Sequence, residues 1–114
     1  MKIIKKSEAD IFERPYSRKT YKLLSHKFDN PIESIVFYLS FLPTGRFDKH
    51  HHSKSNELIF FPNGGKMKVN NELYTLEEWD GVLLEPGDTH GLDIVDKDTV
   101  HLAIKMPDIN DKIS

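Results

Sequence analysis

The chain has 114 residues, with 16 lysines and arginines, 18 aspartates and glutamates, and no cysteine. This length suits one compact domain, and the lack of cysteine excludes disulfide bonds, thiolate metal ligands and a cysteine nucleophile. The formal net charge of −2 gives no reason to expect nucleic acid as a partner, because phosphate binding favours a basic excess. We also expect a cytoplasmic location and no membrane partner, since no apolar run approaches the ~18 residues of a membrane helix and the first residues lack a signal peptide's apolar stretch.

The N-terminal part of the chain has the least regular pattern. A short helical turn is expected within residues 7–12, and residues 14–24 leave three alternatives open: an edge strand, an arm over the mouth of a barrel, or a dimer contact. We predict that residues 1–34 form an arm or edge strands packed on the body of the domain, and that residues 35–114 form this body as a barrel.

From residue 35 onward, short apolar runs rich in β-branched and aromatic residues alternate with Pro, Gly, Asn and Asp, which indicates many short strands. Asn70 and Asn71 suit a tight hairpin turn because asparagine tolerates positive φ, another turn is expected at 96–98, and a helical turn is the expectation for 76–79. Strands at this spacing favour an all-β, antiparallel sandwich or barrel. The expected strands cover 35–41, 57–61, 66–69, 72–76, 81–84, 90–95 and 99–105.

Three consecutive histidines, His50, His51 and His52, lie in the middle of the chain, where an expression tag is not expected. Side chains alternate between the two faces of a strand, so His50 and His52 point the same way and His51 points the opposite way. Two imidazoles on one face can converge on one metal ion. The alternative without metal binding is a solvated polar loop in which the histidines occur by chance.

Two further residues can join this pair. Glu57 opens an apolar run, where a carboxylate needs a partner to offset its desolvation, and His90 follows the turn at 86–89. The alternatives are an edge carboxylate for Glu57 and a turn cap for His90. Imidazoles with one carboxylate suit Fe(II), Mn(II), Ni(II), Co(II) or Zn(II), and a site without thiolates that leaves room for water is more often catalytic than structural.

These residues resemble the two motifs of the cupin family. The first cupin motif has a glycine, a short gap, His-x-His, three or four residues, Glu, six residues and Gly. This chain matches it, with a first gap one residue short, at Gly45, His50, His52, Glu57 and Gly64.

The second cupin motif ends in Pro-x-Gly-x-x-His, and the chain reads Glu85-Pro86-Gly87-Asp88-Thr89-His90. Gly87 and His90 match, the proline lies one place late, and the opening glycine of the motif falls on Trp79. The resemblance covers about residues 35–105. It implies a cupin-type double-stranded β-helix, a jelly-roll barrel, with His50, His52, Glu57 and His90 as the ligands of one divalent transition metal.

The resemblance does not decide the activity, because this fold carries many functions. We expect a metal-dependent enzyme of oxygenase or isomerase type acting on a small polar molecule; the alternatives are a non-catalytic small-molecule-binding or sensor module and a barrel whose metal only stabilises the fold. Family members are often dimers and barrel edges invite pairing, so a homodimer is expected.

Several other residues leave a role open. His101 is either an inward-facing base or substrate contact or, as the preferred interpretation, a partly exposed histidine on the outer face. Arg46 either meets an anionic substrate or is an exposed loop residue. The larger aromatic residues are interpreted as core or dimer-interface residues that could also wall a pocket: Phe37, Phe41, Phe60, Phe61 and Trp79.

Overall fold

A computed structural model describes residues 1–28, 34–42, 49–91 and 99–114, and Gly45, Arg46 and the turn expected at 96–98 lie outside these ranges. Within them, every strand pairing is antiparallel and the one helical element is the 3-10 turn η1 (Lys6–Glu8). No helix in this part of the chain has the length and apolar character to cross a membrane. The expected all-β, antiparallel fold class is therefore confirmed.

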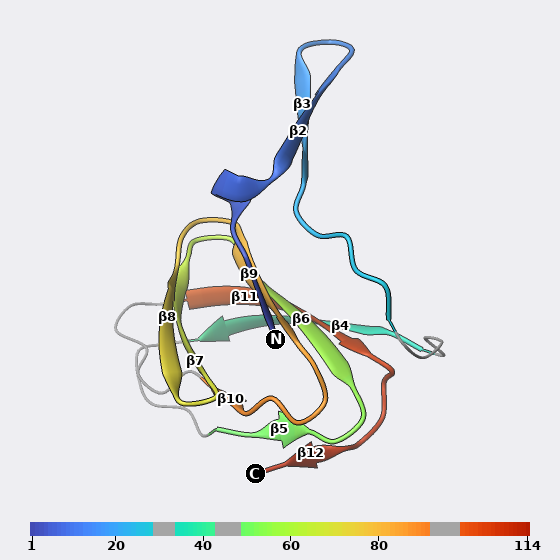
Figure 1. Cartoon of the computed structure of the whole chain (residues 1–114), viewed down its shortest axis with the longest axis vertical. Helices are drawn as coiled ribbons and strands as arrows, with labels where there is room; N and C mark the ends of the chain where they lie inside the picture. Colours follow the sequence, from blue (N-terminus) through green and yellow to red (C-terminus); the bar gives the residue numbers. More distant parts are fainter. Residues whose placement is uncertain (29–33, 43–48, 92–98) are drawn as a thin grey trace.

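The larger layer is a five-stranded sheet whose order departs from the order of the sequence (Figure 1). Strands far apart in the chain, such as β6 and β11, lie side by side at its centre, because chain crossovers separate consecutive strands. From one edge to the other, the strands are β1 (Lys2–Ile4), β9 (Asp80–Leu84), β6 (Asn56–Phe61), β11 (Thr99–Met106) and β4 (Val36–Leu42).

A second, three-stranded sheet faces the first and has the order β10 (His90–Gly91), β7 (Gly65–Val69), β8 (Glu72–Leu76). Asn70 and Asn71 link β7 to β8 with φ values of 48° and 69°, which confirms the predicted hairpin turn at these asparagines. Of the strand expected at 90–95, the structure describes only the two residues of β10, and the remainder lies outside the described ranges.

The hydrophobic core lies between the two sheets. Phe61 of β6 is fully buried and packs with side chains from β7, β8, β9 and β11, since each strand turns alternate residues inward. Burial of this kind is the main favourable term in folding. The buried cluster consists of Ile59, Phe61, Met67, Val69, Leu76, Val82, Leu84 and Ala103.

The N-terminal segment after β1 forms a hairpin that projects from the body of the molecule (Figure 1). Its strands, β2 (Asp10–Arg14) and β3 (Arg18–Lys22), are exposed at every residue. The helical turn expected over 7–12 is therefore wrong for the second half of that range, because cross-strand pairing with β3 extends the backbone from Asp10. The division into an arm (1–34) and a barrel (35–114) stays a prediction.

A tight turn connects β8 to β9 in place of the helical turn expected at 76–79. Its bend places Trp79 at φ 66° with 46% of its surface exposed. Asp80, only 1% exposed, fixes this turn: its carboxylate accepts hydrogen bonds from the backbone N–H of Glu77 (2.8 Å) and of Lys6 (2.9 Å). It also pairs with Lys5 Nζ at 3.0 Å. One buried carboxylate thus ties the N-terminal segment to the barrel.

Replacing Asp80 by alanine is expected to lower the free energy of unfolding by roughly 3 kcal/mol, because two backbone donors and an ammonium lose their acceptor. Desolvation opposes ionisation, but these donors outweigh it and lower the pKa of Asp80 below its usual value. The stabilisation is complete above the ordinary aspartate pKa of about 4 and is lost as the pH falls below it. Urea unfolding at pH 7 and pH 3 measures the difference in free energy of unfolding between D80A and wild type, and the exposed Asp10→Ala variant is the control. Equal stability of D80A and wild type at pH 7 contradicts the role of Asp80.

Candidate metal centre

The predicted ligand residues come from three places in the fold. The backbones of His50 and His90 pair directly, with His50 N to His90 O at 2.9 Å and His90 N to His50 O at 2.8 Å. His52 ends the short strand β5 (His51–His52), and Glu57 lies near the start of β6. This pairing explains why residues 40 positions apart in sequence reach the same space.

The four side chains that the sequence singles out lie together. His50, His52, Glu57 and His90 each offer one ligand atom, and these atoms all lie within 4.8 Å of one another. The rings of His50 and His90 have their centroids 4.3 Å apart, and those of His50 and His52 lie 5.2 Å apart. Such a cluster matches the size of one coordination sphere.

His90 shows that a cation fits this cluster. Its side chain is 3% exposed, its Nδ1 lies 3.2 Å from the backbone oxygen of Asp88, and its Nε2 is buried without a hydrogen-bond partner. Desolvation lowers the pKa of His90 below its ordinary value, which favours the neutral ring. A buried nitrogen with a free lone pair facing a carboxylate is what a metal ligand requires.

Glu57 provides the negative charge of the cluster. Its Oε2 lies 2.8 Å from His52 Nε2, its Oε1 lies 4.0 Å from His90 Nε2, and the side chain is 13% exposed. The donor set of three imidazoles and one carboxylate suits a borderline first-row divalent ion and disfavours Ca²⁺ and Mg²⁺, which prefer oxygen ligands. The residues present therefore fit a transition metal.

The structure adds Asp111 and Lys105 around His52, which the sequence analysis missed. Asp111 Oδ1 lies 3.1 Å from His52 Nδ1 and 3.1 Å from Lys105 Nζ. Desolvation acts to raise the pKa of Asp111, but its hydrogen bonds, led by those from the backbone of Lys54 and Ser55, lower it well below the usual range. Asp111 is thus an anion held against the imidazole from the side opposite Glu57.

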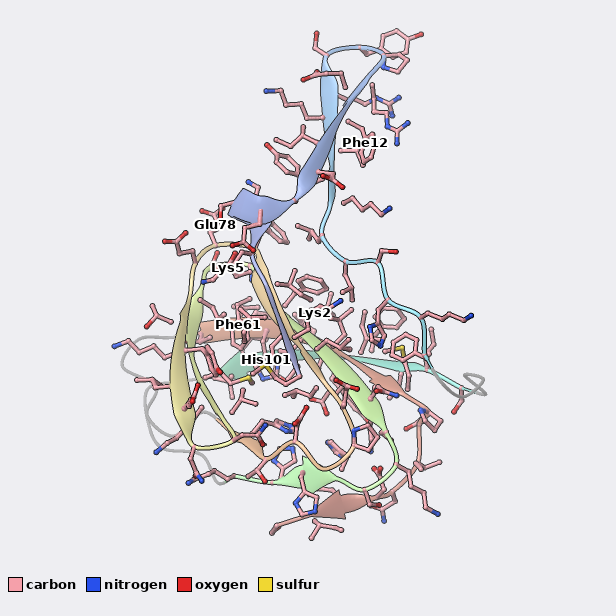
Figure 2. The ribbon with its side chains drawn as sticks, in the orientation of Figure 1. Lys2, Lys5, Phe12, Phe61, Glu78 and His101 are labelled. Carbon is pink, nitrogen blue, oxygen red and sulfur yellow. The ribbon has the colours of Figure 1, made fainter. Side chains whose placement is uncertain are left out.

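The other candidates have mixed outcomes. His51 is absent from the cluster and pairs through its backbone with Ile113 of β12 (Lys112–Ile113). For His101 the preferred outer-face interpretation is wrong: its Nδ1 is buried and its ring lies 5.8 Å from that of the core residue Phe61. Figure 2 labels both side chains, which lie near each other. Arg46 lies outside the described residues.

No protein-family model and no curated protein sequence matches the chain. Solved structures do. A cupin protein from Bacteroides fragilis aligns with a TM-score of 0.57 at 18% identity, covering 80% of this chain and 87% of that one. Pac13 from Streptomyces, described as a nucleoside dehydratase, aligns with a TM-score of 0.60 at 13% identity, covering 96% and 87%.

Salicylate 1,2-dioxygenase from Pseudaminobacter salicylatoxidans also aligns, with a TM-score of 0.54 at 15% identity, over 63% of this chain and 21% of the dioxygenase. The chain thus spans about a fifth of that protein. At these identities the likeness concerns the fold, and it agrees with the antiparallel topology and with the two histidine motifs. The chain has the fold of the cupin superfamily.

Proposed function

We propose that the chain is a small metal-dependent enzyme of oxygenase or isomerase type, with His50, His52, Glu57 and His90 as ligands of one Fe, Mn, Ni, Co or Zn ion. The observation that carries the proposal is the convergence of the four ligand atoms within 4.8 Å, with His90 Nε2 buried and unpartnered. A bound ion supplies Lewis acidity toward a substrate oxygen. Structural neighbours named as a dehydratase and a dioxygenase support an enzymatic use of this fold.

His101 is the residue that we propose as a substrate contact near the cluster. It lies on β11 on the same face as the core residue Ala103, and the charges of Glu57 and His90 influence it. Burial lowers the pKa of His101, so the ring is neutral at pH 7 and its buried, unpartnered Nδ1 can hydrogen-bond a substrate or take a proton from it. A small polar molecule is the class of substrate that this position serves.

Metal content and oxygen uptake test this function. The protein is purified anaerobically, its metals are quantified, and oxygen consumption and product formation are followed with a panel of small hydroxy, keto and phenolic acids. We expect one metal per chain and turnover that falls at least about tenfold in His101→Phe at unchanged metal content. Binding of panel compounds without any turnover would replace the enzyme with a sensor module, and absence of metal would overturn the proposal.

We also propose that two copies associate through the outer face of the five-stranded sheet. Phe37, Leu39 and Phe41 of β4 point away from the core and are 59%, 59% and 72% exposed. An antiparallel sheet with one face on the core normally has a polar outer face. These three residues, called the outer patch below, are a departure from that rule and favour burial against a partner.

The size and charge of the exposed apolar surface favour a second copy as this partner. From the ~150–250 Å² that a large side chain buries, the outer patch exposes roughly 350 Å². This is close to half of the ~800 Å² that each partner contributes to a standard interface. Because β4 carries no charged residue, the patch can face its own copy across a two-fold axis without repulsion.

The double variant Phe37→Lys/Phe41→Lys is expected to convert a dimer to a monomer, because four lysines would then meet across the interface of a two-fold dimer. Leu73→Lys is the matched control, since Leu73 is an equally exposed apolar residue (62%) on β8. Sedimentation equilibrium measures the outcome. A monomeric wild type, or a dimer that survives the double substitution, contradicts the proposed interface.

A further inference from the structure

The C-terminal segment contacts the candidate metal centre through one side chain. β12 (Lys112–Ile113) pairs with β5, with Lys112 opposite His52, so the preceding residue Asp111 lies beside His52. The Asp111 side chain is 5% exposed, and its backbone oxygen accepts a hydrogen bond from Ser53 N at 3.3 Å. A carboxylate in this position is buried, and burial without compensation is costly.

Four donors compensate the Asp111 carboxylate and leave it no freedom to turn. Oδ2 accepts hydrogen bonds from the backbone N–H of Lys54 and of Ser55, both at 2.8 Å. Oδ1 lies 3.1 Å from Lys105 Nζ and 3.1 Å from His52 Nδ1. Lys105 is itself anchored on the backbone oxygen of Ile109. The carboxylate is therefore a rigid acceptor presented to one nitrogen of His52.

The two ring nitrogens of His52 face different partners. Nδ1 faces Asp111, and Nε2 lies 2.8 Å from Glu57 Oε2, inside the cluster. An ionised carboxylate only accepts hydrogen bonds, so Nδ1 donates its proton to Asp111, and Nε2, the nitrogen directed into the cluster, is left as the ligand atom when a cation binds. A hydrogen bond of this kind orients a ligating imidazole and raises its basicity.

We propose that Asp111 is a positioning residue of the metal centre, which fixes the tautomer and orientation of His52, with Lys105 balancing its charge. This inference rests on the proposed metal site, and it adds a contribution from the C-terminal segment that the four-ligand motif does not contain. Asp111 is not one of the four clustered ligand residues and would act on a bound metal through its contact with His52.

Asp111→Asn keeps the shape of the side chain but removes its charge. We expect the affinity for Zn(II) and Co(II), measured by competition with a chromophoric chelator, to fall by about 10–100-fold, and the visible spectrum of the Co(II) protein to change. Asp108→Asn is the matched control, because Asp108 is an exposed aspartate on the same segment. Unfolding of the metal-free variants shows whether the change is one of general stability.

NMR of the ring nitrogens of His52 in the Zn(II)-loaded wild-type protein tests the inference without any variant. We expect a protonated Nδ1 and a metal-bound Nε2. The opposite assignment overturns the inference, as does an Asp111→Asn variant that binds both metals as tightly as wild type. Wild-type protein that binds neither metal overturns the proposed function instead, so the two failures are distinguishable.

Discussion

Replacing His52 with alanine is expected to remove most of the bound metal, whereas the same change at the adjacent His51 leaves one metal per chain. His52 is 6% exposed and directs Nε2 into the cluster, while His51 lies outside it. Because loss of a direct ligand exceeds the effect of losing a supporting residue, the affinity should fall by about 100-fold or more. Metal analysis after dialysis against a weak chelator measures the retained stoichiometry.

His51→Ala is the matched control for His52→Ala, since both variants remove one imidazole from the same strand. Equal loss of metal in the two variants contradicts the assignment of faces along β5. Retention of metal in both would exclude His52 as a ligand. The comparison therefore tests the site and the two-residue period of the strand in one experiment.

Changing Glu57 to glutamine is the second large effect we expect. Glu57 is the only anionic member of the cluster, and glutamine keeps its size while removing the charge. The affinity for Fe(II) and Mn(II), which favour carboxylate ligands, should fall by about 100-fold or more, and the affinity for Zn(II), which accepts neutral imidazoles well, should fall less. Anaerobic competition titrations with a fluorescent chelator measure both constants.

Glu78→Gln is the control for this substitution, because Glu78 is exposed on the turn before β9 and is not a member of the cluster. An unchanged order and strength of metal binding in Glu57→Gln would show that the carboxylate is not a ligand.

Most of the two larger sheets could be predicted because most of their strands have a local signal. The run that became β6 is rich in β-branched and aromatic residues, the run of β7 alternates polar with apolar residues, and the run of β9 is continuously apolar. All three are bounded by Gly, Pro or Asn, and their predicted and observed ranges agree within a residue. The N-terminal hairpin lacked such a signal. Its strands have no buried face, so no hydrophobic period marked them.

The proximity of the four candidate ligands was predictable for a similar reason. His50 and His52 share a face because the period of a strand is two, and the matching motif placed Glu57 and His90 nearby. Asp111 could not be found in this way, because it is 59 residues from His52 and reaches it only through the pairing of β12 with β5. Its sequence surroundings have no motif or period.

For His101, the two-residue alternation of side chains along a strand does not show which face points toward the core. Val100, Leu102 and Ile104 form one face of β11, and the less apolar set Thr99, His101, Ala103 and Lys105 forms the other. The more apolar face is the outer one here, so alternation alone does not reveal the inner face. The register with β6 resolves it: Ala103 lies opposite the buried Ile59, and His101 shares that face. The apolar outer face that caused the error is the same feature that supports the proposed dimer.

A crystal structure of the metal-loaded protein, with an anomalous difference map recorded at the absorption edge of the bound metal, tests the metal centre most directly. We expect one peak per chain at about 2.0–2.2 Å from a nitrogen of each of His50, His52 and His90 and from an oxygen of Glu57. A peak that lies elsewhere, or one that leaves His90 outside bonding distance, would contradict the account.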